Sequence, residues 1–130
     1  MLDATCPWRI AKELRTRGYV DATSAEELGK AEWKDPAWLT WLHSDFSDFA
    51  STPYVLVTYD NNMPTHHEPL ITAYGTTLAI IDKEGYDVSG LTLEQYWREV
   101  IHRHAHRFAE QAVRRIFKYR ANARRTEVKL

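Results

Sequence analysis

Residues 54–60, YVLVTYD, are the stretch that decides the fold. Their continuous run of β-branched and aromatic side chains is typical of a strand buried on both faces, as in a parallel sheet. A second such run, TTLAIID, occupies residues 76–82. Between them a helix is expected from about Pro64 to Tyr74, ended by Gly75. A strand, a helix and a strand in this order predict a parallel sheet with helices packed against it.

The chain before this stretch divides into units of the same kind. Met1 and Leu2 indicate the end of a strand, and a helix is expected to open at Pro7 and stop at Gly18. Residues 19–24, YVDATS, indicate another short strand. The alternation of strands and helices therefore extends to the start of the sequence.

A further helix is expected to begin at Asp35-Pro36. Asp35 can cap the free amides of a first turn, and Pro36 loses no hydrogen bond there. The apolar residues of this helix would be Trp38, Leu39, Trp41 and Leu42.

The last part of the chain predicts a long helix from Thr92 towards residue 118. One apolar stripe at helical spacing supports it: Leu93, Trp97, Ile101, Ala105, Phe108, Ala112, Ile116 and Tyr119. Together these elements predict a single three-layer α/β/α domain over residues 1–130. It would have a central, mostly parallel sheet and a basic, helical C-terminal segment over about 92–130.

Size and composition restrict the class of protein. A chain of 130 residues with 44% hydrophobic and 27% charged residues suits one globular domain rather than a disordered or fibrous chain. Its apolar runs are far shorter than the roughly 20 residues that cross a bilayer, and no signal peptide opens it. Cys6 is the only cysteine, which excludes an internal disulfide and Cys-pair zinc sites. A cytoplasmic location without membrane contact is expected.

Charge is distributed unevenly along the chain. Residues 1–90 hold 14 acidic and 7 basic residues, whereas residues 91–130 hold 4 acidic and 10 basic ones. An acidic, cation-binding site beside a basic surface is what a metal-dependent nuclease needs. Alternatively, the basic end docks on the acidic body or on a partner.

Three acidic residues stand where this fold would bring them to one edge of the sheet. Asp3 and Asp60 each follow an expected strand, and Asp35 heads a helix that would start at the same rim. Converging carboxylates need a cation between them to stay ionised, and Mg²⁺ or Mn²⁺ suits oxygen ligands. Such an ion supports hydrolysis of a phosphodiester. The alternative is that Asp35 only caps its helix and that Asp3 and Asp60 are solvated loop residues.

Three segments in this order resemble the PIN-like nucleases. They are LDATCPWRIAKELRTRGY at residues 2–19, KDPAWLTWL at 34–42 and YVLVTYDNNMP at 54–64. The similarity covers roughly residues 1–82. It is closest to the compact branch in which a first strand ends in Asp before a Pro-containing helix, and in which a later strand ends Val-Thr-x-Asp.

The resemblance implies roles for individual acids. Asp3, Asp35 and Asp60 match the catalytic, metal-holding acids of the family. Glu27, with Glu26 beside it, is a weaker candidate for a second-strand acid. The turn after Asp60 reads Asn61-Asn62-Met63 where relatives often have an Asp and a Phe, so Asn62 or a water would supply a fourth oxygen ligand. The first strand is nearly absent, or it starts upstream of Met1.

Many members of this family are VapC-type toxins of type II toxin-antitoxin pairs. The resemblance therefore implies a Mg²⁺- or Mn²⁺-dependent endoribonuclease that cuts tRNA, rRNA or mRNA and is neutralised by a cognate antitoxin. It implies a homodimer or a toxin-antitoxin hetero-oligomer, and it requires no nucleophilic side chain. The alternative is a catalytically inactive PIN-like scaffold that binds a protein partner or RNA.

Basic and histidine residues near the C-terminal end suggest how RNA would be held. Arg103, Arg107, Arg114 and Arg115 are the candidates for binding RNA phosphates, and the same surface could instead seat an acidic antitoxin segment. Five histidines form two sets. His102, His104 and His106 lie on the long helix, and His66 and His67 follow the Asp60 loop. The first set favours a partly cationic surface over a metal site. One of the second set could touch a substrate phosphate or simply lie on the surface.

Overall fold

The computed structural model describes residues 1–46, 54–122 and 124–130. Its sheet has four strands in the order β1 (Leu56–Thr58), β2 (Leu78–Ile81), β3 (Ile116–Tyr119) and β4 (Arg125–Glu127). Strands β1, β2 and β3 are parallel, and β4 pairs antiparallel to β3. The expected α/β class with a mostly parallel sheet is confirmed.

Two single-residue bridges extend the sheet beyond β1. Leu2 pairs in parallel with Val57 on one side and with Ser24 on the other. The main-chain N–H of Asp3 donates to the carbonyl of Val57 at 2.8 Å, and that of Ala25 donates to Leu2 at 2.9 Å. The two short strands expected in this region are therefore reduced to bridges, because the chain turns away immediately after Asp3.

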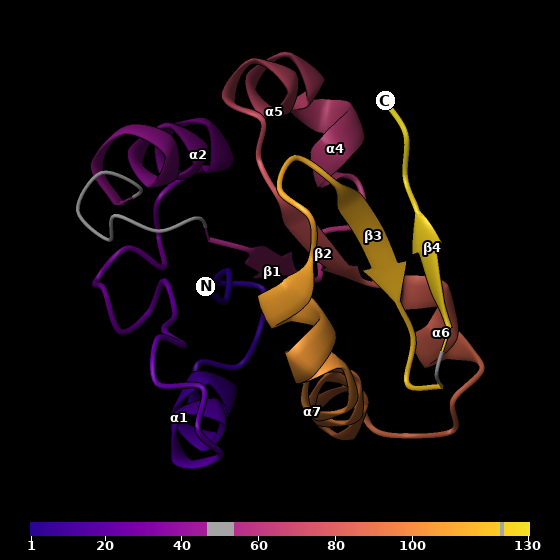
Figure 1. Cartoon of the computed structure of the whole chain (residues 1–130). Helices are drawn as coiled ribbons and strands as arrows, with labels where there is room; N and C mark the ends of the chain where they lie inside the picture. The colour runs from indigo at the N-terminus through magenta and orange to yellow at the C-terminus, as the bar shows by residue number, and fades with distance from the viewer. Residues whose placement is uncertain (47–53, 123) are drawn as a thin grey trace.

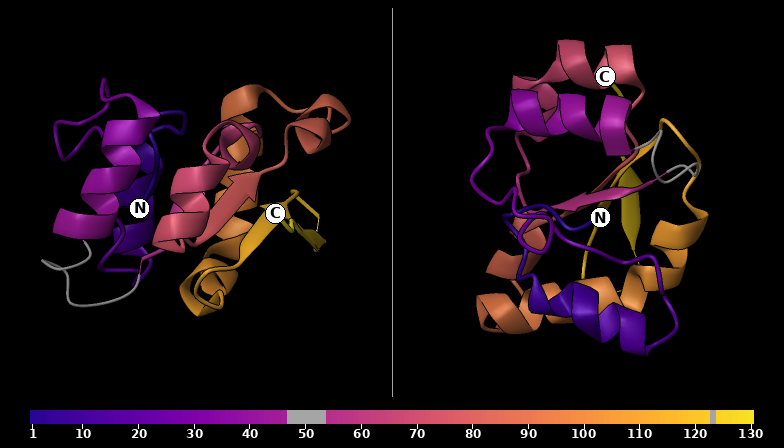
Figure 2. Two further views of the ribbon diagram at one scale, coloured as in Figure 1. Left: turned by 90° about the horizontal axis from the view of Figure 1, so that it is seen from above. Right: turned by 90° about the vertical axis from the view of Figure 1, so that its left-hand side faces the viewer.

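Helices cover both faces of the sheet (Figures 1 and 2). Helices α1 (Arg9–Thr16) and α7 (Leu93–Glu110) pack together on one face. Helices α2 (Asp35–Trp41) and α5 (Glu68–Tyr74) pack together on the other. Helix α6 (Lys83–Asp87) follows β2.

The buried strand β2 divides its side chains between two hydrophobic clusters. Ala79 and Ile81 belong to the cluster that contains α1 and α7, whereas Leu78 and Ile80 belong to the cluster that contains α2 and α5. All four side chains are fully buried. Because successive side chains of a strand point to opposite faces, a continuous apolar run is what such a central strand requires.

Helix α2 begins at Asp35 as expected, but Asp35 does not cap it. The capping position is occupied by Lys34, no side chain makes a capping hydrogen bond, and Asp35 lies within the first turn. The capping role expected for Asp35 is therefore wrong, and its carboxylate faces other groups. The helix continues as a short π-helix, Leu42–Phe46.

The helix expected from Pro64 to Tyr74 is divided into α4 (Met63–His66) and α5. His67 separates the two, with φ −125° and ψ 28°. Pro69 explains the break, since it lacks the N–H that would continue the helix and its ring crowds the carbonyl four residues earlier. Gly75 ends α5 in the left-handed conformation, at φ 60°, as the sequence predicted.

The long C-terminal helix is shorter than expected. It starts with a capping box at Thr92 and ends at Glu110, so the prediction of helix from 111 to 118 is wrong. Ile116 and Tyr119, which the sequence placed on the helical stripe, lie in β3 instead. The open edge of β2 explains the difference, because a strand there satisfies main-chain groups that would otherwise lack partners. Within the described part of the chain, no helix has the length and apolar character needed to span a membrane.

Candidate functional site

Three carboxylates from distant parts of the chain come within electrostatic range of one another. Asp3 follows the Leu2 bridge, Asp60 follows β1, and Asp35 lies in the first turn of α2. Burial raises the pKa of Asp35, and the negative charges of Asp3 and Asp60 raise it further. The carboxyl ends of the parallel strands therefore carry an acidic site, as expected for this class of sheet.

Asp3 is the most deeply placed of the three, with 5% of its surface exposed. Two hydroxyls donate to its Oδ2: Oγ1 of Thr58 at 2.8 Å and Oγ1 of Thr5 at 3.1 Å. Burial raises the pKa of Asp3, these hydrogen bonds oppose the change, and the charge of Asp60 adds to it. The carboxylate is thus held rigidly, yet it is costly to ionise.

The same two hydroxyls also fix the loop that carries Asp60. The main-chain N–H of Tyr59 donates to Thr5 Oγ1 at 2.9 Å, and that of Asp60 donates to Thr58 Oγ1 at 3.0 Å. Each hydroxyl therefore donates to Asp3 and accepts from the chain after β1. Sequence reasoning missed Thr5 as a positioning residue, although its spacing from Asp3 mirrors the spacing of Thr58 from Asp60.

The two asparagines after Asp60, Asn61 and Asn62, make different contacts. The amide of Asn61 donates to the carbonyls of Tyr59 and Ile81, both at 2.9 Å, and accepts from the N–H of Lys83 at 3.1 Å. It ties the end of β1 to the end of β2. Asn62 donates its main-chain N–H to Oδ1 of Asp60 at 3.0 Å, and its side chain is exposed to solvent.

A histidine that the sequence placed only near the loop contacts one of the acids directly. Nε2 of His67 lies 3.4 Å from Oδ2 of Asp35. The break between α4 and α5 brings the His67 ring to this position. The positive charge of His67 lowers the pKa of Asp35, which partly offsets the effect of burial and of the other two acids. The neighbouring His66 is exposed.

The two glutamates considered for a second-strand acid, Glu26 and Glu27, have different surroundings. Glu27 forms an ion pair with Arg15, at 2.6 Å, and accepts a hydrogen bond from Oγ of Ser24 at 3.0 Å. Glu26 instead lines a hollow that also contains Asp3. The structure therefore associates Glu26, rather than Glu27, with Asp3.

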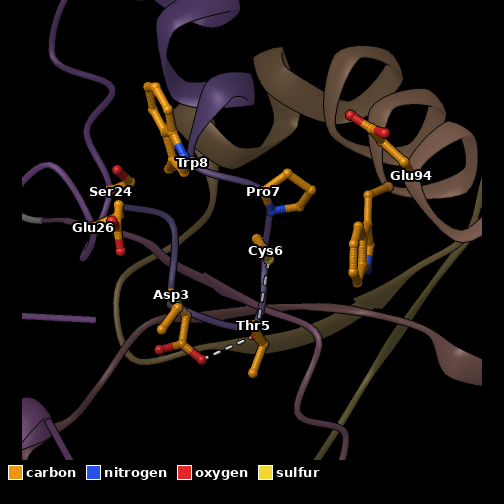
Figure 3. A pocket seen from close by; sticks show the side chains of 10 residues that line it. Asp3, Thr5, Cys6, Pro7, Trp8, Ser24, Glu26 and Glu94 are labelled. Carbon is orange, nitrogen blue, oxygen red and sulfur yellow. Dashed lines mark hydrogen bonds between the residues drawn. The ribbon is translucent and has the colours of Figure 1, made fainter. Parts of the chain in front are cut away.

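This hollow has a volume of about 430 Å³. Its lining includes Asp3, Thr5, Trp8, Ser24, Glu26 and Trp97. Figure 3 shows Trp8, Ser24, Glu26 and Asp3 on one side of the segment formed by Thr5, Cys6 and Pro7, with Glu94 on the other. Asp35 and Asp60 are not part of the lining among the described residues.

The donor chemistry of the site suits a hard divalent cation. Carboxylate oxygens are the ligands that Mg²⁺ and Mn²⁺ prefer, and a cation would relieve the repulsion that raises the pKa values of Asp3 and Asp35. In residues 1–46, 54–122 and 124–130, however, no three His, Cys, Asp or Glu side chains are already grouped as metal ligands. One oxygen of Asp35, Oδ2, contacts His67, so an ion shared with the other two acids would compete with this contact or use the other oxygen.

The four arginines expected to bind RNA do not gather at the acidic edge. Arg114 and Arg115 immediately precede β3, at the amino end of that strand. Since β1 and β3 run in the same direction within the sheet, this edge is opposite to the one that holds Asp60. Arg115 pairs with a carboxylate of β4. Arg103 and Arg107 lie on α7, and Arg103 is exposed.

The three histidines of α7 point to different surroundings. His102 contacts Glu13 at 3.0 Å, and it also contacts Arg17. His104 is buried, and its Nε2 lies 2.6 Å from the carbonyl oxygen of Arg120. Burial lowers the pKa of His104. His106 is exposed. They therefore form separate contacts rather than one shared site.

Cys6 lies close to Asp3 but is unsuited to nucleophilic catalysis. It is buried, and its thiol donates to the carbonyl of Val57 at 3.7 Å. Burial and the nearby charge of Asp3 raise its pKa to about 12. Because the thiolate is the reactive form, the thiol stays protonated and inert at neutral pH.

Comparison of the chain with protein-family models, with curated proteins and with solved structures found no match.

Proposed function

We propose that this chain is a PIN-like, three-layer α/β/α nuclease domain that cleaves RNA with the help of Mg²⁺ or Mn²⁺. The observation that carries the proposal is that Asp3, Asp35 and Asp60 lie within electrostatic range of one another, with Asp60 at the carboxyl end of a parallel strand. Burial and mutual repulsion raise the pKa values of Asp3 and Asp35. Burying unpaired carboxylates opposes folding, and perturbed carboxyl groups of this kind cluster at functional sites.

Neighbouring groups of the protein fix the position of each of the three carboxylates. Thr5 and Thr58 fix the carboxylate of Asp3, and the N–H of Asn62 orients that of Asp60. His67 contacts Asp35 at 3.4 Å and so orients its carboxylate. A bound divalent cation would neutralise charge on the scissile phosphate and lower the pKa of a water for in-line attack. The protein then needs no nucleophilic side chain, in keeping with the inert Cys6.

The cellular role that we propose is that of the toxin in a type II toxin-antitoxin pair. The support is the ordered similarity of residues 2–19, 34–42 and 54–64 to VapC-type PIN-like proteins. A cognate antitoxin would neutralise the activity. A small reading frame directly beside this one in the genome is expected to encode it.

One observation favours the second candidate, an inactive PIN-like scaffold that binds a protein partner or RNA. Asp35 is engaged by His67, and the described acids are not grouped as a ligand set. A scaffold of this kind would keep the fold and lose metal-dependent cleavage. Measuring cleavage therefore separates the two candidates.

The decisive experiment compares Asp60→Asn with the wild-type protein on single-stranded RNA, with Mg²⁺, with Mn²⁺ and with a chelator. Loss of an acid that holds the cation should lower cleavage at least about a hundredfold, since even supporting partners of metal sites cost about 10- to 100-fold. Asp21→Asn, at an exposed turn, is the matched control and should cleave normally. Wild-type expression should arrest growth, and Asp60→Asn should relieve the arrest. Equal cleavage by the wild type and Asp60→Asn would contradict the proposal.

A further inference from the structure

The hollow beside Asp3 combines an exposed aromatic ring, that of Trp8, with a carboxylate that makes no ion pair among the described residues, that of Glu26. Trp8, at the start of α1, has 41% of its surface exposed and lines the hollow with Asp3 and Glu26. A partly exposed indole that lines a hollow offers an apolar face on which a planar ligand can stack. The volume of about 430 Å³ lies in the range of sites for small ligand groups.

The polar part of the lining is chiefly an acceptor of hydrogen bonds. Glu26 is exposed and makes no ion pair among the described residues. Its ionised carboxylate can accept hydrogen bonds but cannot donate them. Ser24 next to it is already engaged with Glu27. A ligand edge that meets Glu26 therefore has to present N–H donors.

Charge around the hollow decides which part of a nucleotide enters. Asp3, Glu26 and Glu94 all line it, so they repel a phosphate and accept an uncharged base. The guanidinium of Arg9 lies over the Trp8 ring, 5.6 Å from its centre and outside that lining, so a base would stack on the opposite face. It is placed to attract the phosphate that is attached to a base stacked on Trp8.

We propose that this hollow is a nucleobase subsite, in which Trp8 stacks on one unpaired base of single-stranded RNA next to the scissile phosphate. Glu26 accepts a hydrogen bond from the amino group of that base. Adenine, cytosine and guanine carry such a group. The only N–H donor of uracil, N3–H, lies between two carbonyl oxygens that repel a carboxylate. The subsite therefore disfavours uracil. This inference rests on the proposed nuclease function, which supplies the adjoining phosphate position at Asp3.

Binding of uncleavable RNA by Trp8→Ala tests the stacking role. The probe is a short 2′-O-methyl RNA with adenine at every position, titrated by fluorescence anisotropy with Mn²⁺ present. Base stacking on an aromatic side chain is worth roughly five- to a hundredfold in affinity, and Trp8→Ala should lose that factor. Trp8→Phe should retain most of it.

Trp33→Ala is the matched control for this test. Trp33 is 42% exposed, so it equals Trp8 in exposure, but it packs against Trp41 and does not line the hollow. Thermal unfolding of both alanine variants shows whether each is folded. Equal RNA affinity of folded Trp8→Ala and the wild type would overturn the proposal, and so would an equal loss in Trp33→Ala.

Replacing the carboxylate tests the base preference. Wild-type protein should bind the uracil probe more weakly than the adenine, cytosine and guanine probes. Glu26→Gln presents an amide that can also donate, so it should bind uracil nearly as well as the others. A wild type that does not discriminate against uracil would refute the role of Glu26.

Failure of this subsite and failure of the proposed nuclease activity give different results. If wild-type protein cleaves RNA and Asp60→Asn does not, but Trp8→Ala binds normally, only the subsite is wrong. If no variant cleaves but affinity still depends on Trp8, the nuclease activity is wrong and the subsite stands. The binding assay uses RNA that cannot be cut, so the two readouts are independent.

Discussion

At the scale of single residues, Asp3 shows how the fold sets the protonation of its own site. The carboxylate is buried, and its two hydroxyl partners are neutral, so no positive charge beside it compensates for lost hydration. The charge of Asp60 adds to the difficulty of ionising it. In the proposed function a divalent cation would supply the counter-charge, so protons and divalent ions should compete for this site.

This competition predicts an unusual pH dependence for the metal-free protein. The pKa values of Asp3 and Asp35 are raised above 3.8 in the folded state, so the folded protein binds more protons than the unfolded chain in that range. These two groups therefore favour folding most at low pH, and that contribution is lost as the pH rises from 3.8 through their raised values. Thermal unfolding in a chelator, over a series of pH values, should show this loss.

A matched variant isolates the two acids. In the double variant Asp3→Asn and Asp35→Asn the loss should disappear, because neither amide titrates. The gain in melting temperature from added Mn²⁺ should grow over the same pH interval in the wild type only. Identical pH profiles for the wild type and the double variant would show that these carboxyl groups do not control stability.

At the residue scale, a local pattern predicts where each acid lies in the fold: Asp60 follows β1, and Asp35 lies in the first turn of α2. That the acids form a metal site stays a prediction. The partners Thr5 and His67 were not assigned, since their roles depend on which loops meet in space: Thr5 is 53 residues from Thr58 in sequence. Their contacts come from the parallel pairing of Leu2 with Val57 and from the break between α4 and α5.

At the scale of elements, the junction between α7 and β3 depends on one buried amide. The side chain of Gln111 donates to the carbonyls of Leu78, at 2.7 Å, and Arg115, at 3.0 Å, and accepts from the hydroxyl of Tyr119 at 2.6 Å. It joins the end of α7 to both β2 and β3. A pattern of apolar spacing cannot reveal this, because Ile116 and Tyr119 also fit the helical stripe.

Gln111→Leu should therefore destabilise the protein strongly. The substitution removes the bonds that Gln111 makes to the carbonyl of Leu78 and to the hydroxyl of Tyr119, which, among the described residues, keeps only its contact with Arg125 at 3.4 Å. A buried polar group that loses its partner costs about 1–3 kcal/mol. We expect a loss of roughly 2–4 kcal/mol in the free energy of unfolding, measured in urea. Glu110→Gln, at the exposed neighbouring position, is the control and should change stability little. A loss below about 0.5 kcal/mol would show that the amide is not the anchor of β3.

At the scale of the whole molecule, Asp60 and the two arginines that precede β3, Arg114 and Arg115, lie at different edges of the sheet. Helix α7 connects them: its first turn meets the carboxyl edge, where Tyr96 donates to the carbonyl of Asp82, and its end meets the amino edge at Gln111. With 18 residues, α7 is about 27 Å long. The charge asymmetry seen along the sequence is therefore only partly a separation in space. Arg114 and Arg115 lie at the amino edge, whereas Arg120 pairs with Asp82 at the carboxyl edge.

This separation makes the role of the arginines depend on the length of the RNA. A stacked strand advances about 3.4 Å per nucleotide, so about eight nucleotides are needed to reach from Asp3 along α7 to the amino edge. Arg103 and Arg114 are exposed and make no ion pair in the described part of the chain. Reversing both, as Arg103→Glu with Arg114→Glu, should leave binding and cleavage of an RNA of about six nucleotides unchanged.

A strand of about twenty nucleotides should respond differently to the same double variant. Its affinity should fall, and the slope of log affinity against log salt should flatten by about 0.7 for each phosphate that the protein no longer neutralises. Lys12→Glu, on α1, carries the same type of charge change at a residue outside the proposed path along α7 and serves as the control. If the long strand binds the double variant as it binds the wild type, RNA does not follow α7. The exposed arginines would then bind an acidic protein partner instead. In that case the double variant should bind the proposed antitoxin more weakly, and its cleavage of RNA should persist.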